Sequence, residues 1–226
     1  MEKLLEKHLG QVGLAPTLFY PTGATRLRPQ DVPGYQEPDA GAGEAESDAW
    51  AWFLKGENPP AYRRLHEGMA GLGPVISSAG GVDGVVGFSQ GGCVAALLAA
   101  ALESPRRAVP ENGGPYDWGW VEALRAANGQ RPLRFCVVYS GFSGVMPELE
   151  WLYEPKIRTP TLHFLGGLDT VVDEGRSRRL IDRCEDAVVV QHPGGHYVPV
   201  SREFVAPLVG FTRKHAGEPE AGSSTA

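Results

Sequence analysis

Residues 87–91, Gly-Phe-Ser-Gln-Gly, constrain the fold of this chain most tightly, because they join an apolar run to a helix of small residues. The preceding run, residues 82–86, has the β-branched density of a buried strand, and residues 93–100 favour a helix that is buried on most sides. A strand that passes directly into a helix here must reverse its direction within these five residues. Such a turn leaves no room for side chains on the flanking glycines and forces Ser89 into a strained backbone conformation. The pattern predicts a nucleophile elbow, a turn that exposes one serine hydroxyl.

Two later loops add an acid and a histidine in an informative order. With 30 glycines in 226 residues, the five-residue pattern alone arises easily by chance. Asp169 closes a Gly-rich loop after the apolar run 161–165, and His196 closes a second such loop after the run 188–191. Serine, then acid, then histidine is the chain order of α/β-hydrolases. We therefore predict an α/β fold of the α/β-hydrolase type, with a mostly parallel sheet flanked by helices.

These three residues fit a division of labour in acyl transfer. A serine hydroxyl is a poor nucleophile at neutral pH, so Ser89 needs a base to take its proton as it attacks an acyl carbon. We expect His196 to be that base and Asp169 to hold the imidazole in the correct tautomer. The backbone N–H of Gln90, directly after the nucleophile, is the expected first donor to the oxyanion.

Other residues compete for these roles. His192 lies near the end of a strand and before Pro193, which favours a packed or surface histidine over a base. Asp173 stands just before a helical stretch and is a better N-cap than a triad acid. His163, inside an apolar strand, is typical of a satisfied core histidine. The side chain of Gln90 can be structural even where its main chain is catalytic.

Several large side chains follow the strands that build the site. In such folds these loops set specificity, so the side chains can line an apolar acyl pocket, but they can equally be ordinary core. Periodicity does not separate the two interpretations. The residues are Trp50, Trp52, Phe142, Met146 and Trp151.

The remaining pattern predicts alternating strands and helices with few interruptions. We expect an opening helix through Leu4, Leu5, Leu9 and Val12, a short strand at 17–20, and a solvated loop from 28 to 48. Later helices are expected around 62–72, at 121–127, from 174 to 184 and through 204–211, with strands at 134–140, 161–165 and 187–191.

Composition sets the broad class. A chain of 226 residues with 42% hydrophobic residues fits one domain, which we place at 1–216, followed by a small, polar tail at 217–226 that we expect to be disordered. The net charge of -6 and a pI near 5.5 argue against nucleic acid or an anionic membrane as partner. No run approaches the length of a membrane span.

The three cysteines and the charged residues 2–7 indicate the cellular compartment of the protein. Three cysteines cannot all pair, and Cys93 and Cys136 lie in apolar segments where a thiol acts as a small hydrophobe. Residues 2–7 are too charged for a secretory signal. We therefore expect a reducing, cytoplasmic location, with no metal or cofactor, and the sequence leaves the oligomeric state open.

The motifs together resemble a known family. Residues 87–92, Ser140-Gly141-Phe142, 166–169 and 192–199 are similar, in order and spacing, to the family of serine hydrolases. These small α/β-hydrolases include fungal esterases and thioesterases encoded beside polyketide synthases. The resemblance extends from Leu4 to about His215. It implies a lidless or lightly covered enzyme that cleaves small-molecule carboxyl esters or thioesters without a cofactor, with a role in polyketide metabolism as one family-level option.

The chain departs from the family pattern at its first strand. Family members normally begin with a strand that ends in a His-Gly loop, which supplies the second oxyanion N–H. Here Met1 opens at the helix that follows, so we expect that strand to be missing, with a gap between residues 17–20 and the nucleophile strand. Our hypothesis is an N-terminally truncated or mis-started enzyme. The alternative is a catalytically impaired binding protein with an incomplete oxyanion hole.

Overall fold

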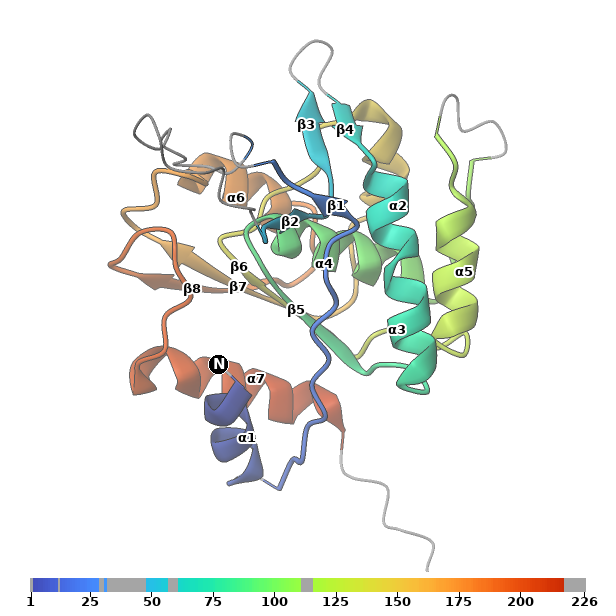
Figure 1. Ribbon diagram of the computed structural model, residues 1–226. Coiled ribbons are helices and arrows are strands. Elements are labelled where there is room, and N and C mark those ends of the chain that lie inside the picture. Colours follow the sequence, from blue (N-terminus) through green and yellow to red (C-terminus); the bar gives the residue numbers. More distant parts are fainter. Residues whose placement is uncertain are drawn as a thin grey trace, which may run out of the picture.

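A four-stranded parallel sheet forms the centre of the molecule (Figure 1). The computed structural model describes residues 2–11, 13–28, 31, 48–56, 61–110 and 116–217. The strands lie side by side in chain order as β5 (Gly84–Phe88), β6 (Phe135–Tyr139), β7 (Thr161–Gly166) and β8 (Val188–His192). Because all pairs are parallel, the four carboxyl ends meet at one edge of the sheet. The predicted α/β architecture is confirmed.

Helices cover both faces of this sheet (Figure 1). One face carries α2 (Leu65–Ala70), α3 (Leu72–Ser78), α4 (Gln90–Leu102), α5 (Gly119–Ala127), the 3-10 helix η2 (Pro147–Leu152) and α6 (Glu174–Ile181). The other carries α1 (Glu2–Gly10) and α7 (Arg202–Ala216). Within the described ranges, no helix is both long and apolar enough to cross a bilayer.

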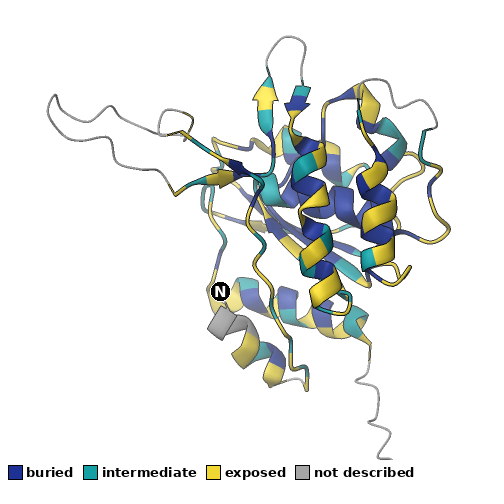
Figure 2. Ribbon diagram, turned by 45° about the vertical axis from the view of Figure 1, so that its right-hand side comes forward, coloured by how far each residue is buried: buried dark blue, intermediate teal, exposed yellow. Residues whose placement is uncertain are grey.

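The period of two along β6 divides the core into two halves. Cys136 and Val138 pack into the larger cluster, which contains the buried small residues of α4. Val137 and Tyr139 point to the opposite face and join Leu208 of α7. Four of the five residues of β6 are buried, and Figure 2 shows buried residues, in dark blue, where the sheet meets the helices that cover it. Burial on both faces explains why the sequence of β6 is continuously apolar.

The nucleophile strand β5 lies at one edge of this sheet, with β8 at the other. Among the described residues, only β6 pairs with it. Val86 and Phe88 are 45% and 37% exposed, whereas their register partners on β6, Val137 and Tyr139, are buried. The open side of β5 agrees with the gap expected beside the nucleophile strand.

The N-terminal third differs from the prediction. The strand expected at 17–20 is wrong: among the described residues, positions 17–20 belong to no strand. Two short antiparallel pairs form instead: β1 (Thr25–Arg26) with β2 (Trp50–Ala51), and β3 (Leu54–Gly56) with β4 (Ala61–Arg63). The helix expected around 62–72 divides into α2 and α3 at Gly71. Val12, most of the 28–48 loop and residues 218–226 lie outside the described residues.

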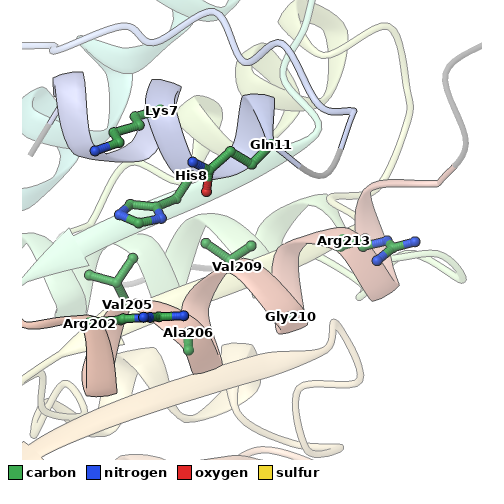
Figure 3. A pocket seen from close by; sticks show the side chains of 9 residues that line it. All are labelled: Lys7, His8, Gln11, Arg202, Val205, Ala206, Val209, Gly210 and Arg213. Carbon is green, nitrogen blue, oxygen red and sulfur yellow. The ribbon is translucent and has the colours of Figure 1, made fainter.

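A groove of about 600 Å³ lies between α1 and α7 (Figure 3). Apolar positions of α7 form part of its wall, and basic side chains from both helices point into it or along its rim. None of the residues singled out from the motifs lines it. The lining residues are Lys7, His8, Gln11, Arg202, Val205, Ala206, Val209, Gly210 and Arg213.

The elbow glycines predict opposite responses to alanine. A Cβ on Gly87 would lie 2.1 Å from the carbonyl oxygen of Gly91, so we expect Gly87→Ala to lower the free energy of unfolding by at least about 1–3 kcal/mol. A Cβ on Gly91 would meet only the indole nitrogen of Trp52, at 3.8 Å, and the sequence-based expectation of a collision is therefore wrong at that glycine. We expect Gly91→Ala, inside α4, to be neutral or stabilising. Urea unfolding of the two variants tests this, and equal losses would contradict it.

Candidate active site

The chain reverses at Ser89 with a backbone geometry that side-chain-bearing residues seldom adopt. Ser89 has φ 54° and ψ −117°, and α4 begins at the next residue. Its N–H donates to the carbonyl of Tyr139 on β6 (2.8 Å), and its own carbonyl accepts from Gly92 and Cys93 in the first turn of α4. These bonds hold the strained residue in place, so its hydroxyl projects from the carboxyl end of β5.

Three side chains from three separate loops meet at this edge of the sheet. The imidazole Nε2 of His196 lies 2.9 Å from Oγ of Ser89. Its Nδ1 lies 2.8 Å from Oδ2 of Asp169. Ser89 follows β5, Asp169 follows β7 and His196 follows β8, so the parallel sheet brings together residues up to 107 positions apart. This continuous hydrogen-bonded chain can pass a proton from the serine hydroxyl to the imidazole.

The glycine-rich segments allow the acid and histidine loops to touch. The N–H of Gly167 donates to the carbonyl of His192 (2.8 Å), and the N–H of Leu168 donates to that of Gly194 (3.0 Å). A Cβ on Gly166 would lie 2.4 Å from the carbonyl oxygen of Gly195. Only glycine permits this approach, and the resulting backbone contacts fix the spacing between Asp169 and His196.

Asp169 is held as a carboxylate. Its side chain is 2% exposed, and its Oδ1 accepts from the N–H groups of Val171 (2.9 Å) and Val172 (2.8 Å). Burial by itself raises the pKa of this carboxyl, but the hydrogen bonds from His196, Val172 and Val171 outweigh it and leave the pKa below its ordinary value. The negative charge therefore persists at neutral pH, where it can orient and stabilise an imidazolium.

Asp169 predicts a specific pH dependence of stability. Because its pKa is lower in the folded chain than in the unfolded one, its contribution is complete above about pH 4 and is lost as the pH falls through the folded-state value. We expect the free energy of unfolding of Asp169→Asn to decline less steeply below about pH 4 than that of the wild type. Urea unfolding at several acidic pH values measures both slopes, and parallel curves would contradict the assignment.

Gln90 supplies both a main-chain donor and a side-chain brace. As the first residue of α4 it has a backbone N–H without an intrahelical acceptor, next to the serine hydroxyl and at the positive end of the helix. Its Oε1 accepts from the N–H of Trp52 (2.7 Å), and its Nε2 donates to the carbonyl of Phe53 (2.9 Å). The amide thus ties the segment before β3 to the elbow.

Loss of that brace should cost stability and order. Gln90→Met keeps the side-chain length but leaves the N–H of Trp52 and the carbonyl of Phe53 without their partner, which we expect to lower the free energy of unfolding by about 1–3 kcal/mol. Gln90→Glu, which keeps one acceptor for the N–H of Trp52, should lose less. Urea unfolding ranks the two variants, and a methionine variant as stable as the wild type would overturn the brace.

The residues considered for an acyl pocket are distributed unevenly. Trp52 lies beside the elbow, and Phe142 is buried with its ring 6.5 Å from that of Phe53. Met146 is buried in the larger core cluster, and Trp151 packs edge to face on Trp118. Trp50 is 45% exposed on β2 and donates to Asp48. Trp52 is bonded to Gln90 at the elbow, and Phe142 contacts Phe53, which Gln90 also holds.

The competing residues lie apart from the hydrogen-bonded chain. Asp173 caps α6, as its position predicts, and accepts from the N–H of Arg176. His192 is buried and its Nδ1 accepts from the N–H of Gly194. His163 is buried in β7, where burial lowers its pKa to about 4. The expectation that it is satisfied is wrong, because its Nε2 has no hydrogen-bond partner among the described residues.

Two features of the site gave no usable signal in the sequence. The ring of Phe88 lies 4.7 Å from that of His196 and packs against the imidazole. It occupies the variable second position of the pentapeptide, which the motif leaves unspecified. The side-chain bonds of Gln90 to residues 52 and 53 join segments 37 and 38 positions apart, and no local pattern reports them.

Comparison with known proteins places the chain in a family. A family model described as "Serine hydrolase (FSH1)" matches residues 1–208. The chain belongs to this serine hydrolase family. Family of serine hydrolases 2 of Saccharomyces cerevisiae is 30% identical over 194 residues, covering 83% of this chain and 79% of that protein. Esterase OVCA2 of Bos taurus is 29% identical over 179 residues, covering 73% of this chain and 67% of the relative.

Other similar proteins are longer or more distant. A protein of Schizosaccharomyces pombe named dihydrofolate reductase is 33% identical over 186 residues, which cover 80% of this chain but only 37% of that protein. The chain therefore spans just over a third of that relative's length. Among solved structures, acyl-protein thioesterase 2 of Zea mays is similar with a TM-score of 0.46 and 20% identity, covering 74% of this chain and 73% of that one.

Proposed function

We propose that this member of the serine hydrolase family cleaves carboxyl esters or thioesters through an acyl-enzyme intermediate on Ser89. The hydrogen-bonded chain of Ser89, His196 and Asp169 is the observation that carries the proposal. A strained elbow, an unprotonated acid and a histidine between them are the elements that acyl transfer by serine requires. The name of one relative, Esterase OVCA2 of Bos taurus, agrees with this chemistry.

The first half-reaction follows from the distances. As Oγ of Ser89 attacks the acyl carbon, its proton passes to Nε2 of His196, 2.9 Å away. The carboxylate of Asp169, bonded to Nδ1, stabilises the imidazolium and keeps the ring oriented. The carbonyl oxygen becomes an oxyanion that accepts from the N–H of Gln90. When the tetrahedral intermediate collapses, the imidazolium gives its proton to the departing alcohol or thiol.

Water completes the cycle by the same route in reverse. His196 takes a proton from a water molecule, the resulting hydroxide attacks the acyl carbon, and the C–O bond to Ser89 breaks. The imidazolium returns its proton to the serine oxygen, and the carboxylic acid leaves. No external oxidant, reductant or metal enters this balance. A thioester differs only in the leaving group, so release of a polyketide acyl chain is one specific form of the same proposal.

A catalytically impaired binding protein is the second candidate. We assign one oxyanion donor, the N–H of Gln90, within the described residues, and no second donor there. Loss of a single donor typically lowers kcat by about 10²–10³-fold. This candidate retains the fold and the hydrogen-bonded chain but predicts no turnover that depends on Ser89.

Substitution of the serine separates the two candidates. We expect Ser89→Ala to lower kcat/KM for p-nitrophenyl esters or acyl thioesters of graded chain length by about 10⁴-fold or more, because it removes the hydroxyl that lies 2.9 Å from Nε2 of His196. Ser78→Ala, on an exposed residue at the end of α3, is the matched control and should hydrolyse as the wild type does. Equal hydrolysis by Ser89→Ala and wild type would refute the nucleophile, and a folded wild type without hydrolysis of any ester would favour the binding protein.

A further inference from the structure

Two cationic side chains share one aromatic ring next to the elbow. Nζ of Lys55, on β3, lies 5.0 Å from the centroid of Phe142, and Cζ of Arg176, on α6, lies 4.4 Å from it. β3 is the strand that the Gln90 side chain positions through Phe53, and α6 begins directly after the loop of Asp169. Segments far apart in the sequence thus bring two positive charges together at Phe142.

This ring is adjacent to the first turn of the nucleophile helix. Phe142 follows Gly141, whose Cα would lie 3.0 Å from a Cβ built on Gly92. The charges of Lys55 and Arg176 also partly offset the burial that raises the pKa of the Cys93 thiol to about 12. Cys93 donates its N–H to the carbonyl of Ser89. Both cations therefore lie within electrostatic range of Cys93, in the first turn of α4.

Neither cation is neutralised within the part of the chain that the structure describes. No carboxylate there forms an ion pair with Lys55 or Arg176, although the chain has more acidic than basic residues. Arg176 donates to the carbonyl of Val171, in the acid loop, which fixes its guanidinium near the site. Burial of Lys55, with the charge of Arg176 second, lowers the pKa of its amine. Like charges held close without a counterion repel each other, and an anion relieves that repulsion.

We propose that Lys55 and Arg176 bind an anionic group, a carboxylate or a phosphate, on the substrate of the Ser89 site. The proposal rests on the hydrolase function proposed above and specifies its substrate class. The anion belongs either to the acyl chain, as in a half-ester of a dicarboxylic acid, or to the leaving group. Lys55 contributes a point charge, and Arg176 contributes a planar fork suited to two oxygens. The ring of Phe142, within 5.0 Å of both groups, offers an apolar contact beside them.

The competing explanation is that both cations merely cap the ring. Cation–π contacts stabilise proteins without any ligand, and Phe142 is buried beneath these side chains. A cap predicts that removal of a charge changes stability but treats charged and neutral substrates alike. An anion site predicts a change in the ratio of kcat/KM between them, which is independent of the amount of folded protein.

The test compares matched substrates in wild type, Lys55→Met and Arg176→Met. Methionine keeps an apolar stem over Phe142 and removes the charge. The acyl arm compares p-nitrophenyl monoglutarate with p-nitrophenyl butyrate. The leaving-group arm compares the butyryl ester of 4-hydroxybenzoate with phenyl butyrate. Arg178→Met is the control, because Arg178 lies on the same helix but pairs with Glu174.

We expect the wild type to favour the anionic substrate in one arm and each methionine variant to lower that ratio by about tenfold or more, while Arg178→Met preserves it. The arm that responds identifies which side of the scissile bond carries the anion. If Arg176→Met does not fold, two measurements still test the anion site. One is the kcat/KM ratio of Lys55→Met between anionic and neutral substrates, and the other is the decline of that ratio in the wild type with added NaCl. Unchanged ratios in both arms overturn the anion site alone, whereas absence of Ser89-dependent hydrolysis of the neutral esters overturns the proposed function.

Discussion

The strained backbone of Ser89 is the constraint on which the rest of the site depends. A residue with φ 54° and ψ −117° persists only when its surroundings fix it, and here β6 and the first turn of α4 both do so through backbone bonds. The same turn requires glycine at position 87, where the returning chain leaves no space for a Cβ. Fold stability and exposure of the hydroxyl are therefore coupled at one residue.

The carboxyl edge of the parallel sheet brings the other two residues of the site to Ser89. Parallel strands end together, so the loops after β5, β7 and β8 deliver a hydroxyl, a carboxylate and an imidazole to one place. Backbone bonds between the loops of Asp169 and His196 make their spacing a property of the main chain. Burial and hydrogen bonding then set the charge of Asp169. The three side chains are therefore preorganised. Acyl transfer by serine needs groups fixed in advance, both to transfer the proton and to stabilise the oxyanion.

Prediction from sequence succeeded where the local periodicity of a segment agreed with the chain order that a known fold requires. The strand, elbow and helix around Ser89 each have a clear period, and the order of serine, acid and histidine suits only a few folds. The expectation of a strand at 17–20 failed because strand formation depends on distant segments as well as on the four residues themselves. Periodicity could not separate core from pocket among the aromatic residues, and the structure puts Trp50 at the surface and Met146 in the core.

The two cations of the proposed anion site could not be predicted from sequence patterns, for a different reason. Lys55 and Arg176 are 121 positions apart and meet only because Gln90 positions β3 and the acid loop leads into α6. Neither residue belongs to a motif, and each alone reads as a solvated charge. Long-range placement of this kind depends on how the short antiparallel pairs sit on the sheet, which no local propensity encodes.

The central claim is that the fold makes one serine hydroxyl nucleophilic through His196. Peptide mass spectrometry after treatment with a fluorophosphonate probe tests it most directly, because the probe reacts with an activated serine and not with an ordinary one. We expect a single adduct, on Ser89, that disappears after unfolding and in His196→Ala. Folded protein that carries no adduct on Ser89, or that is labelled equally well without the imidazole, would contradict the account.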